Sequence, residues 1–402
     1  MITPWARPSA TISRVKIRAV TLGFDLPYPA VVTAPFEAAA RFLTAARAAF
    51  DAAGVEVQTT RVAGPDLGPT LASAGSDLAS WAADTEAAAR GSGIDYLSLG
   101  RLPATAHQFV AERVAPILAA GETVFFSADL IDGRLPSVAM AAACARAVKQ
   151  LASMTPLGFG NLRFAATAHC PPNIPFLPAA YHAGGPPRFS IAVQAADVVV
   201  DALGASGGTS EIEDGLVDRL EAAAAPVERT ADALAAESGF DFVGIDLSPA
   251  PFPSDEISIG AALERGGVDR FGAPGTLYLS AMLTRAIRRT RVRRCGFSGL
   301  MLPLLEDSVL ARRAAECPPS LHELLLYSAV CGTGLDTLPL PEDVSEAELA
   351  GVYLDVVLTA RLLPVPGAQA GDPTTFTFDY LANSRVLPAR GAGAARIVER
   401  GQ

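Results

Sequence analysis

The chain alternates two patterns of hydrophobic and polar positions along most of its length. Short, nearly continuous apolar runs predict strands buried on both faces. Longer segments with an apolar residue every three or four positions predict amphipathic helices. In the first half the pattern predicts strands over 15–24, 55–62, 94–100, 123–129 and 161–169, an apolar strand region over 188–203, and helices over 36–54, 77–93, 107–122 and 135–154.

The second half repeats this alternation. A helix is predicted over 211–239, where an internal proline should kink or split it. Further strands are predicted over 241–251, 296–303 and 335–341, and further helices over 257–267, 275–290, 319–334 and 345–367, the last running into a strand. Buried strands that alternate with helices are typical of an α/β fold with a mostly parallel sheet.

The domain organisation follows from the same pattern. No long linker rich in Ser, Pro, Gly or charge interrupts the alternation, so we expect a single domain over residues 1–402. Segments 22–29 and 243–253 both contain a strand end, Asp-Leu and prolines before a helix. This echo suggests two similar halves, about 15–203 and 204–390.

Composition excludes several classes of protein. Half of the 402 residues are hydrophobic and the net charge is −10, which argues against nucleic acid as a partner because phosphates require a basic surface. The basic cluster at 284–294 falls at a predicted helix end, where arginines complement the helix dipole rather than form a binding patch.

The expected compartment is the cytoplasm. No apolar run of about 18 residues predicts a membrane span, and the N-terminus lacks the apolar core of a signal peptide. The five cysteines are scattered without a CxxC motif, which favours reduced thiols over a structural zinc site.

Polar side chains stand at the ends of several predicted strands. Asp25, Ser127 and Asp246 lie at or near three strand ends, and Ser248 follows in an exit loop. Ligands of parallel α/β folds collect at the carboxyl ends of strands, so these side chains would converge on one rim if the sheet closes into a barrel. We therefore expect Asp25, Ser127 and Ser248 to bind substrate. Asp246 is expected to be catalytic, either orienting the general acid or base or acting as its partner base.

The segment AHCPPNIPFLPAAYHAGG, residues 168–185, holds two of the four histidines, one cysteine and four prolines. Prolines stiffen a long connection, which could hold Asn173, Tyr181 and His182 over a cavity mouth at small entropic cost. The alternative is a covering loop in which Phe176 and Leu177 pack down and the histidines stay in solvent.

His182 is the candidate general acid or base because the pKa of histidine lies near working pH. A hydrogen-bonded structural histidine is the alternative. Cys170 is a candidate nucleophile, although its neighbour His169 should point to the opposite face of the strand. No cofactor is predicted. A divalent metal held by His169, His182 and Asp246 is a further alternative, but their spacing matches no common ligand pattern.

The remaining candidate substrate contacts are Gly204, Ser206, Gly207, Thr276, Ser298 and Gly299. The first three form a turn before a predicted helix, where backbone N–H groups could bind phosphate or carboxylate; a plain tight turn is the alternative. Thr276 begins a helix and offers a similar site. Ser298 and Gly299 lie in a predicted strand, where glycine marks a close approach of backbone or ligand.

Several segments, in a fixed order, resemble an uncharacterised bacterial and archaeal family of PFL-like proteins (domain of unknown function 711): DFVGIDLSPAP, FGAPGT, GFSGLMLP, VCGTGLDTLPLPED and RLLPVPGAQAGD. IRAVTLGF and NIPFLPAAYHAGG fit the same family. The resemblance implies a fold similar to pyruvate formate-lyase, a barrel of two antiparallel halves of parallel strands wrapped by helices. The chain has no glycyl-radical motif and no adjacent cysteine pair, so radical catalysis is not expected.

These features favour an enzyme with non-radical acid–base chemistry on a small oxygenated or anionic metabolite, as a lyase, hydrolase or isomerase. A non-catalytic metabolite-binding or regulatory protein is the first alternative, since some relatives are encoded beside a small amino-acid-binding regulatory protein. A metal-dependent hydrolase is the second. Alanine-rich helices such as 136–152 favour a homodimer, although alanines also permit close packing within one subunit.

Overall fold

The computed structural model describes residues 15–73, 78–205, 208–336, 338–341, 343–362, 381–382 and 385–386. Its strands are β1 (Lys16–Gly23), β2 (Val57–Ala63), β3 (Tyr96–Leu102), β4 (Val124–Asp129), β5 (Ile131–Asp132), β6 (Leu135–Pro136), β7 (Phe164–Thr167), β8 (Arg188–Gln194), β9 (Asp241–Asp246), β10 (Pro339–Leu340), β11 (Leu381–Ala382) and β12 (Arg385–Val386). Eight of them form one sheet in the order β11-β7-β4-β3-β2-β1-β8-β9.

The α-helices are α1 (Ala34–Ala52), α2 (Gly68–Ser73), α3 (Leu78–Gly91), α4 (His107–Phe109), α5 (Ala115–Ala120), α6 (Val138–Met154), α7 (Ala196–Leu203), α8 (Thr209–Ser238), α9 (Ile259–Arg265), α10 (Thr276–Arg289), α11 (Ser308–Glu316), α12 (Leu321–Cys331) and α13 (Glu346–Leu362). A π-helical turn, Val110–Val114, joins α4 to α5. Short 3-10 helices cover Ala104–Ala106, Pro156–Arg163 and Asp255–Ile257.

The direction of the strands changes in the middle of the sheet, between β1 and β8, and again at one edge, where β11 pairs antiparallel with β7. Strands β1, β2, β3, β4 and β7 are parallel to one another, and β8 and β9 are parallel to each other. Between these groups β8 pairs with β1 antiparallel. The predicted α/β fold with a mostly parallel sheet is confirmed. The predicted closed barrel is not found, because β9 and β11 remain edge strands within the described residues.

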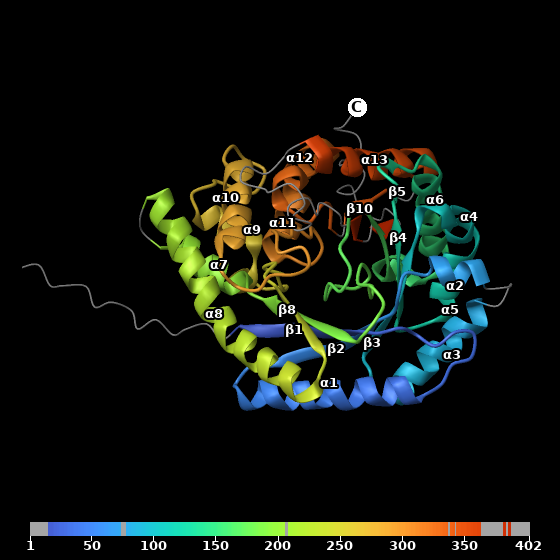
Figure 1. Ribbon diagram of the computed structural model, residues 1–402. Helices are drawn as coiled ribbons and strands as arrows, with labels where there is room; N and C mark the ends of the chain where they lie inside the picture. Colours follow the sequence, from blue (N-terminus) through green and yellow to red (C-terminus); the bar gives the residue numbers. More distant parts are fainter. Residues whose placement is uncertain are drawn as a thin grey trace, which may run out of the picture.

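The two faces of the sheet are covered differently. On the outer face, large side chains such as Leu22, Leu97 and Phe126 belong to the main hydrophobic core with α1, α3 and α6. The other face, called the inner face here, is covered by two loops. The first inner loop (residues 168–187) joins β7 to β8, and the second (residues 290–307) joins α10 to α11. In Figure 1 the green segment before β8 lies on the side of the sheet away from α1.

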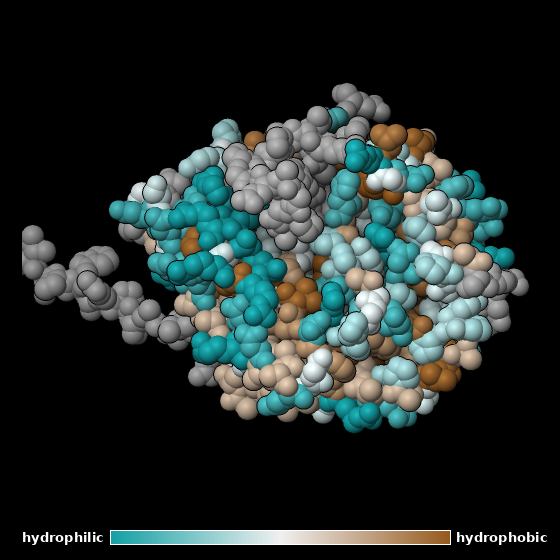
Figure 2. Space-filling model, in the orientation of Figure 1, coloured by the Kyte–Doolittle hydropathy of each residue, from teal (hydrophilic) through white to brown (hydrophobic). Residues whose placement is uncertain are grey.

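Small side chains make room for these loops. The inner face presents Ala19, Ala63, Ala165 and Ala192, and a second core packs on them. That core contains Cys170, Ile174, Phe176, Leu177, Phe297 and Met301 from the two loops. Figure 2 shows hydrophobic residues in brown near the middle of one face of the molecule, between hydrophilic areas. Where a strand alternates large and small residues, the large ones pack under helices and the small ones leave room for the loops.

Three predicted elements are corrected by the structure. The region 188–203 contains strand β8 followed by helix α7, whose residues are mostly buried, so its apolar run hid a helix. Helix α8 runs unbroken through Pro226. The predicted strand 296–303 is part of the second inner loop, and only the neighbouring Arg294 forms a bridge, to Ile245.

The basic cluster at 284–294 is neutralised by α8. Arg285 and Arg289 pair with Glu213 at 2.5 and 2.9 Å, and Arg291 pairs with Glu221 at 2.8 Å. These arginines join α8 to α10 and the residues that follow it. Among the described residues, no helix is both long and apolar enough to cross a bilayer.

Candidate functional site

The first inner loop is attached to the sheet at three places. Thr21 Oγ1 donates to the carbonyl of Pro175 at 2.8 Å, and Ser98 Oγ donates to the carbonyl of Ala180 at 2.8 Å. Near the end of the loop, the backbone N–H of His182 donates to the carbonyl of Gly64 at 2.7 Å. These three hydrogen bonds tie residues 175–182 of the loop to the sheet.

His182 is fully buried in this loop. Its Nδ1 lies 3.0 Å from Asn173 Oδ1, and its Nε2 lies 3.2 Å from the carbonyl oxygen of Gly185 and 4.0 Å from Asp25 Oδ1. Asn173 Oδ1 also accepts the Ala183 N–H at 3.3 Å, which fixes the amide orientation. Both ring nitrogens are occupied by atoms of the same chain, so a proton transfer to substrate would require this loop to open. The expectation that the histidines stay in solvent is wrong for His182.

A charged cluster lies beside His182 at the carboxyl ends of β3 and β4. Arg101 pairs with Asp66 at 2.6 Å and with Asp129 at 3.0 Å, and its guanidinium lies 4.4 Å from the ring centre of Tyr181. Burial raises the pKa of Asp129, and the nearby arginine opposes this shift. Tyr181 OH donates to the Cys170 carbonyl at 3.1 Å. These contacts join the start of the first inner loop, at Cys170, to its end, at Tyr181.

Cys170 lies inside the second core rather than at an opening. Its side chain is buried, and its Sγ lies 3.7 Å from the carbonyl oxygen of Pro171 and 4.0 Å from that of Ala179. A buried thiol is a poor nucleophile in general, because burial disfavours the thiolate.

Asp246, at the end of β9, is also fully buried. Its carboxylate accepts N–H bonds from Ser248 at 2.9 Å, Phe297 at 2.7 Å and Ser298 at 3.0 Å. Burial raises its pKa to about 6, and the three N–H donors oppose the shift without cancelling it. Gly296 has a positive φ of 63°, and a Cβ there would collide with this carboxylate. Asp246 thus holds the turn of the second inner loop.

Three predicted substrate contacts belong to the same turn. Ser248 Oγ accepts the Gly299 N–H at 3.1 Å, and Ser298 Oγ donates to the Cys295 carbonyl at 2.8 Å. A Cβ at Gly299 would approach the Cys331 carbonyl oxygen to 2.6 Å. Gly299 therefore does mark a close approach, as predicted, and the group that approaches it is the backbone of Cys331 and Gly332.

Asp246 and His182 do not meet, contrary to the expectation of one rim. Asp246 is level with Ala192 of β8, and Ala192 is level with Ala19 of β1, whereas His182 lies against Gly23 at the other end of β1. Four residues of strand separate the two levels, about 13 Å at about 3.3 Å per residue. The antiparallel pairing of β8 with β1 causes this, because it sends the carboxyl end of β9 to the opposite edge of the sheet.

The other predicted residues are dispersed. Gly204 caps the end of α7, and Ser206 and Gly207 lie outside the described residues. Thr276 is buried and bonds its own turn, accepting the Gly272 N–H at 3.1 Å. Ser127 points under the first inner loop, and its buried hydroxyl has no hydrogen-bond partner among the described residues.

A cavity of about 400 Å³ opens on the inner face, between the amino ends of β1, β3 and β4 and Arg61 of β2. Its apolar lining comes from the strands and from both inner loops, including Tyr96, Phe125, Phe176, Leu177 and Met301. Its charged lining consists of Arg18, Arg61, Arg163, Glu122, Glu306 and Asp336. The volume and the mixture of apolar and polar groups are typical of small-molecule sites.

The arginines of this cavity are held in place. Arg18 pairs with Glu306 at 3.4 Å. Arg61 Nε donates to Thr59 Oγ1 at 3.0 Å, and its guanidinium lies 5.8 Å from the ring centre of Tyr96. Arg163 donates to the Gly121 carbonyl at 2.7 Å, and burial lowers its pKa. A fixed guanidinium is a pre-organised fork for carboxylate or phosphate.

The sequence analysis missed this cavity, although one signal was present. Arg18 and Arg61 lie within strands β1 and β2, on the face that carries Ala19 and Ala63. A charged residue on the small-residue face of a buried strand needs a polar cavity or a partner. Within the described residues, no group of three or more His, Cys, Asp or Glu side chains could hold a metal ion.

The fold and the cavity define an α/β protein with an open, mostly parallel sheet, helices on its outer face, and a small hollow under its inner loops. The chain belongs to the family described as "Uncharacterised ACR (DUF711)", whose model matches residues 11–382.

Curated relatives carry the name UPF0210 protein. The chain is 35% identical over 246 residues to the one from Pyrobaculum arsenaticum, covering 56% of this chain and 54% of the relative. It is 31% identical over 250 residues to the relative from Methanopyrus kandleri, covering 57% of this chain and 54% of the relative. It is 29% identical over 265 residues to the relative from Desulforudis audaxviator, covering 60% of this chain and 57% of the relative. The matched part thus spans little more than half of each relative.

Proposed function

We propose that this chain is an enzyme that performs non-radical acid–base chemistry on a small anionic metabolite in the inner-face cavity. One observation supports this proposal: Arg18, Arg61 and Arg163 line the same cavity as the carboxylate of Glu306. The cavity has a volume of about 400 Å³ and a partly apolar lining. Arginines neutralise and orient an anion, and an adjacent carboxylate can move a proton once substrate has displaced water.

In this proposal the residues predicted from the sequence act on the site indirectly. His182 and Asn173 position the first inner loop, which contributes Phe176 and Leu177 to the cavity wall. Asp246 positions the second inner loop, which contributes Met301 and Glu306. The proposed proton carrier is Glu306, because Arg18 holds its carboxylate at the cavity.

The experiment is a screen in which the full chain is incubated with small carboxylates and sugar phosphates, and NMR detects any conversion of each compound. For a substrate that is found, Arg61→Gln should weaken binding at least tenfold, about 1.4 kcal/mol. Glu306→Gln should retain binding and lose roughly 10²- to 10⁴-fold in rate. Arg41→Gln, an exposed arginine on α1, is the matched control and should change neither. Equal activity in Glu306→Gln would contradict the assignment.

A non-catalytic metabolite-binding protein is the second candidate. It is favoured by the pairing of Arg18 with Glu306, since a carboxylate already engaged by an arginine is less available for proton transfer. Saturable binding that depends on Arg61, without any turnover, would support this function over the first. Elemental analysis of the purified protein tests the third hypothesis, a metal-dependent hydrolase.

We further propose that the sheet is an open form of the pyruvate formate-lyase-like barrel, that the chain forms a homodimer, and that it resides in the reducing cytoplasm. The antiparallel junction of β1 and β8 between two parallel groups supports the open barrel, and the five cysteine thiols support the reducing compartment. The alanine-rich helix α6 packs on α5 and α13 of its own chain, so only its exposed positions, such as Val138, Ala139 and Ala142, are open to a second copy. Light scattering tests the oligomeric state.

A further inference from the structure

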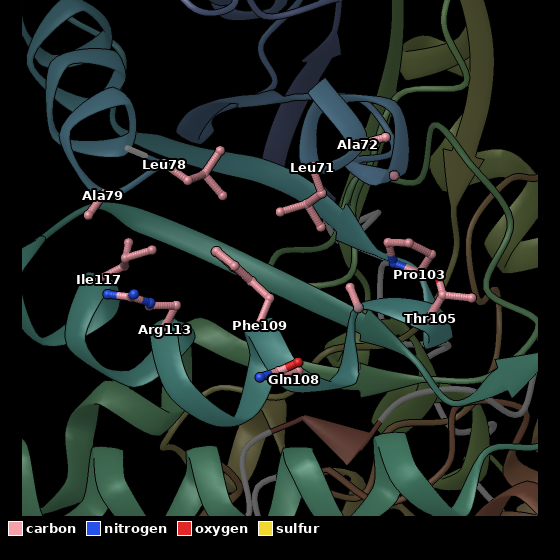
Figure 3. A pocket seen from close by; sticks show the side chains of 12 residues that line it. Leu71, Ala72, Leu78, Ala79, Pro103, Thr105, Gln108, Phe109, Arg113 and Ile117 are labelled. Atoms are coloured by element: carbon pink, nitrogen blue, oxygen red, sulfur yellow. The ribbon is translucent and has the colours of Figure 1, made fainter. Parts of the chain in front are cut away.

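A second hollow lies on the outer side of the molecule, away from the inner loops. This groove has a volume of about 470 Å³ and lies between α2 and α3 on one side and the segment from Pro103 to α5 on the other. Figure 3 shows the side chains of Leu71, Leu78 and Phe109 pointing into a common space, with Ile117 at one end. The interior of the groove is therefore apolar.

The edge of the groove carries a cation. Arg113 lines it, is exposed, and has no ion-pair partner among the described residues. Nearby, Arg90 pairs with Glu122 at 2.8 Å and Arg101 pairs with Asp66 at 2.6 Å. An exposed guanidinium beside an apolar interior complements a molecule with an anionic head and an apolar body.

The backbone at this edge is also irregular. Arg113 belongs to the π-helical turn Val110–Val114, which lies between two short α-helical pieces. Such turns are rare and occur frequently at functional sites. The turn places Phe109 and Arg113 along the same groove that Ile117 lines further on. Shape, charge and backbone geometry thus point to the same position.

We propose that this groove binds a small amphipathic carboxylate, with the carboxylate on Arg113 and the apolar body between Leu71, Leu78 and Phe109. This site is separate from the inner-face cavity, since the two share no lining residue. The groove lacks the several arginines of that cavity, so it selects a ligand that is mostly apolar and carries one negative charge.

The probe is decanoate, used below its micelle concentration with the full-length chain, and the uncharged control is decanol. Calorimetry should show saturable binding of one decanoate per chain, and decanol should bind at least tenfold more weakly. Arg113→Gln should weaken decanoate binding at least tenfold and leave decanol binding unchanged. Arg229→Gln, an exposed arginine of α8, should leave both unchanged.

Two further variants distinguish this groove from other sites. Ala79→Phe should fill the groove and abolish binding, whereas Ser80→Phe, on an exposed neighbouring position outside the lining, should not. Non-saturable binding, or equal loss in both phenylalanine variants, overturns the proposal. Loss of decanoate binding in Arg61→Gln instead of Arg113→Gln would also overturn it, because the ligand would then occupy the inner-face cavity.

Discussion

The outer and inner faces of the sheet are made from alternate residues of the same strands, yet they serve different purposes. Phe126 of β4 is fully buried under helices, whereas its neighbour Phe125 is half-buried and lines the inner cavity. The outer face holds large side chains in one continuous core. The inner face holds alanines under two loops, and its larger side chains, Tyr96 and Phe125, lie at the cavity. Stability is concentrated on the first face and candidate chemistry on the second.

The largest expected effect tests this division directly. Phe126→Ala should lower the free energy of unfolding by about 3–5 kcal/mol, because it leaves a cavity in the outer core. Phe125→Ala should cost only about 1 kcal/mol and should instead weaken ligand binding in the inner cavity. Urea unfolding of both variants is the measurement. Equal losses of stability would show that the two faces do not divide as described.

The next effect concerns the buried carboxylate of the second inner loop. The pKa of Asp246 is raised by burial to about 6, above its ordinary value of 3.8, so the folded state favours the protonated form. Its contribution is fully present below about pH 4 and is lost as pH rises through 6, a change of about 3 kcal/mol at about 1.4 kcal/mol per pKa unit. The free energy of unfolding is measured from pH 4 to 7 for the native chain and for Asp246→Asn. The native chain should lose about 3 kcal/mol more than the variant over this range. Parallel curves would contradict the assignment.

A smaller effect is expected at His182. His182→Ala removes two hydrogen bonds within the first inner loop and should cost about 2 kcal/mol. His107→Ala, on an exposed position, is the control and should change stability by less than about 0.5 kcal/mol. If His182→Ala abolishes turnover while leaving stability unchanged, the residue is catalytic and not a positioning residue.

The smallest effect lies outside the sheet, where α8 meets the basic segment. The pKa of Glu213 is lowered, chiefly by its hydrogen bonds from Arg285, so its contribution is present at neutral pH and lost as pH falls. Glu213→Gln should cost about 1 kcal/mol, and less in 1 M salt. Glu237→Gln, an exposed position of the same helix, should have no measurable effect. A salt-independent loss would indicate packing instead of charge.

Local pattern was sufficient for most elements of the fold. The strand at 15–24 and the helix at 36–54 appear as β1 and α1 almost where they were predicted, because their periodicity is unambiguous. Region 188–203 was misassigned, since α7 is buried on nearly all sides and an all-apolar run has no helical period to read. The segment 296–303 was misassigned because its glycines accommodate a carboxylate and a carbonyl rather than a strand partner.

The site was harder to predict, because it depends on strand direction. The first inner loop was recognised from its prolines, and Phe176 and Leu177 pack down as the covering-loop alternative required. The prediction that His182 and Asp246 lie together is wrong, because no local pattern in 188–194 shows that β8 runs antiparallel to β1. The inner cavity is composed of residues from nine separate segments, so only a three-dimensional arrangement reveals it.

The attachment of the first inner loop has a consequence for the order of folding. Its anchors, Thr21, Ser98 and Gly64, lie some 80 to 155 positions earlier in the chain than the loop atoms they bind. Contacts between such distant positions form late, because the entropy of closing the intervening chain must be overcome first. The outer core can thus assemble while the hollow is still missing, and competence to bind a metabolite should appear in a slower kinetic phase than the acquisition of helical structure.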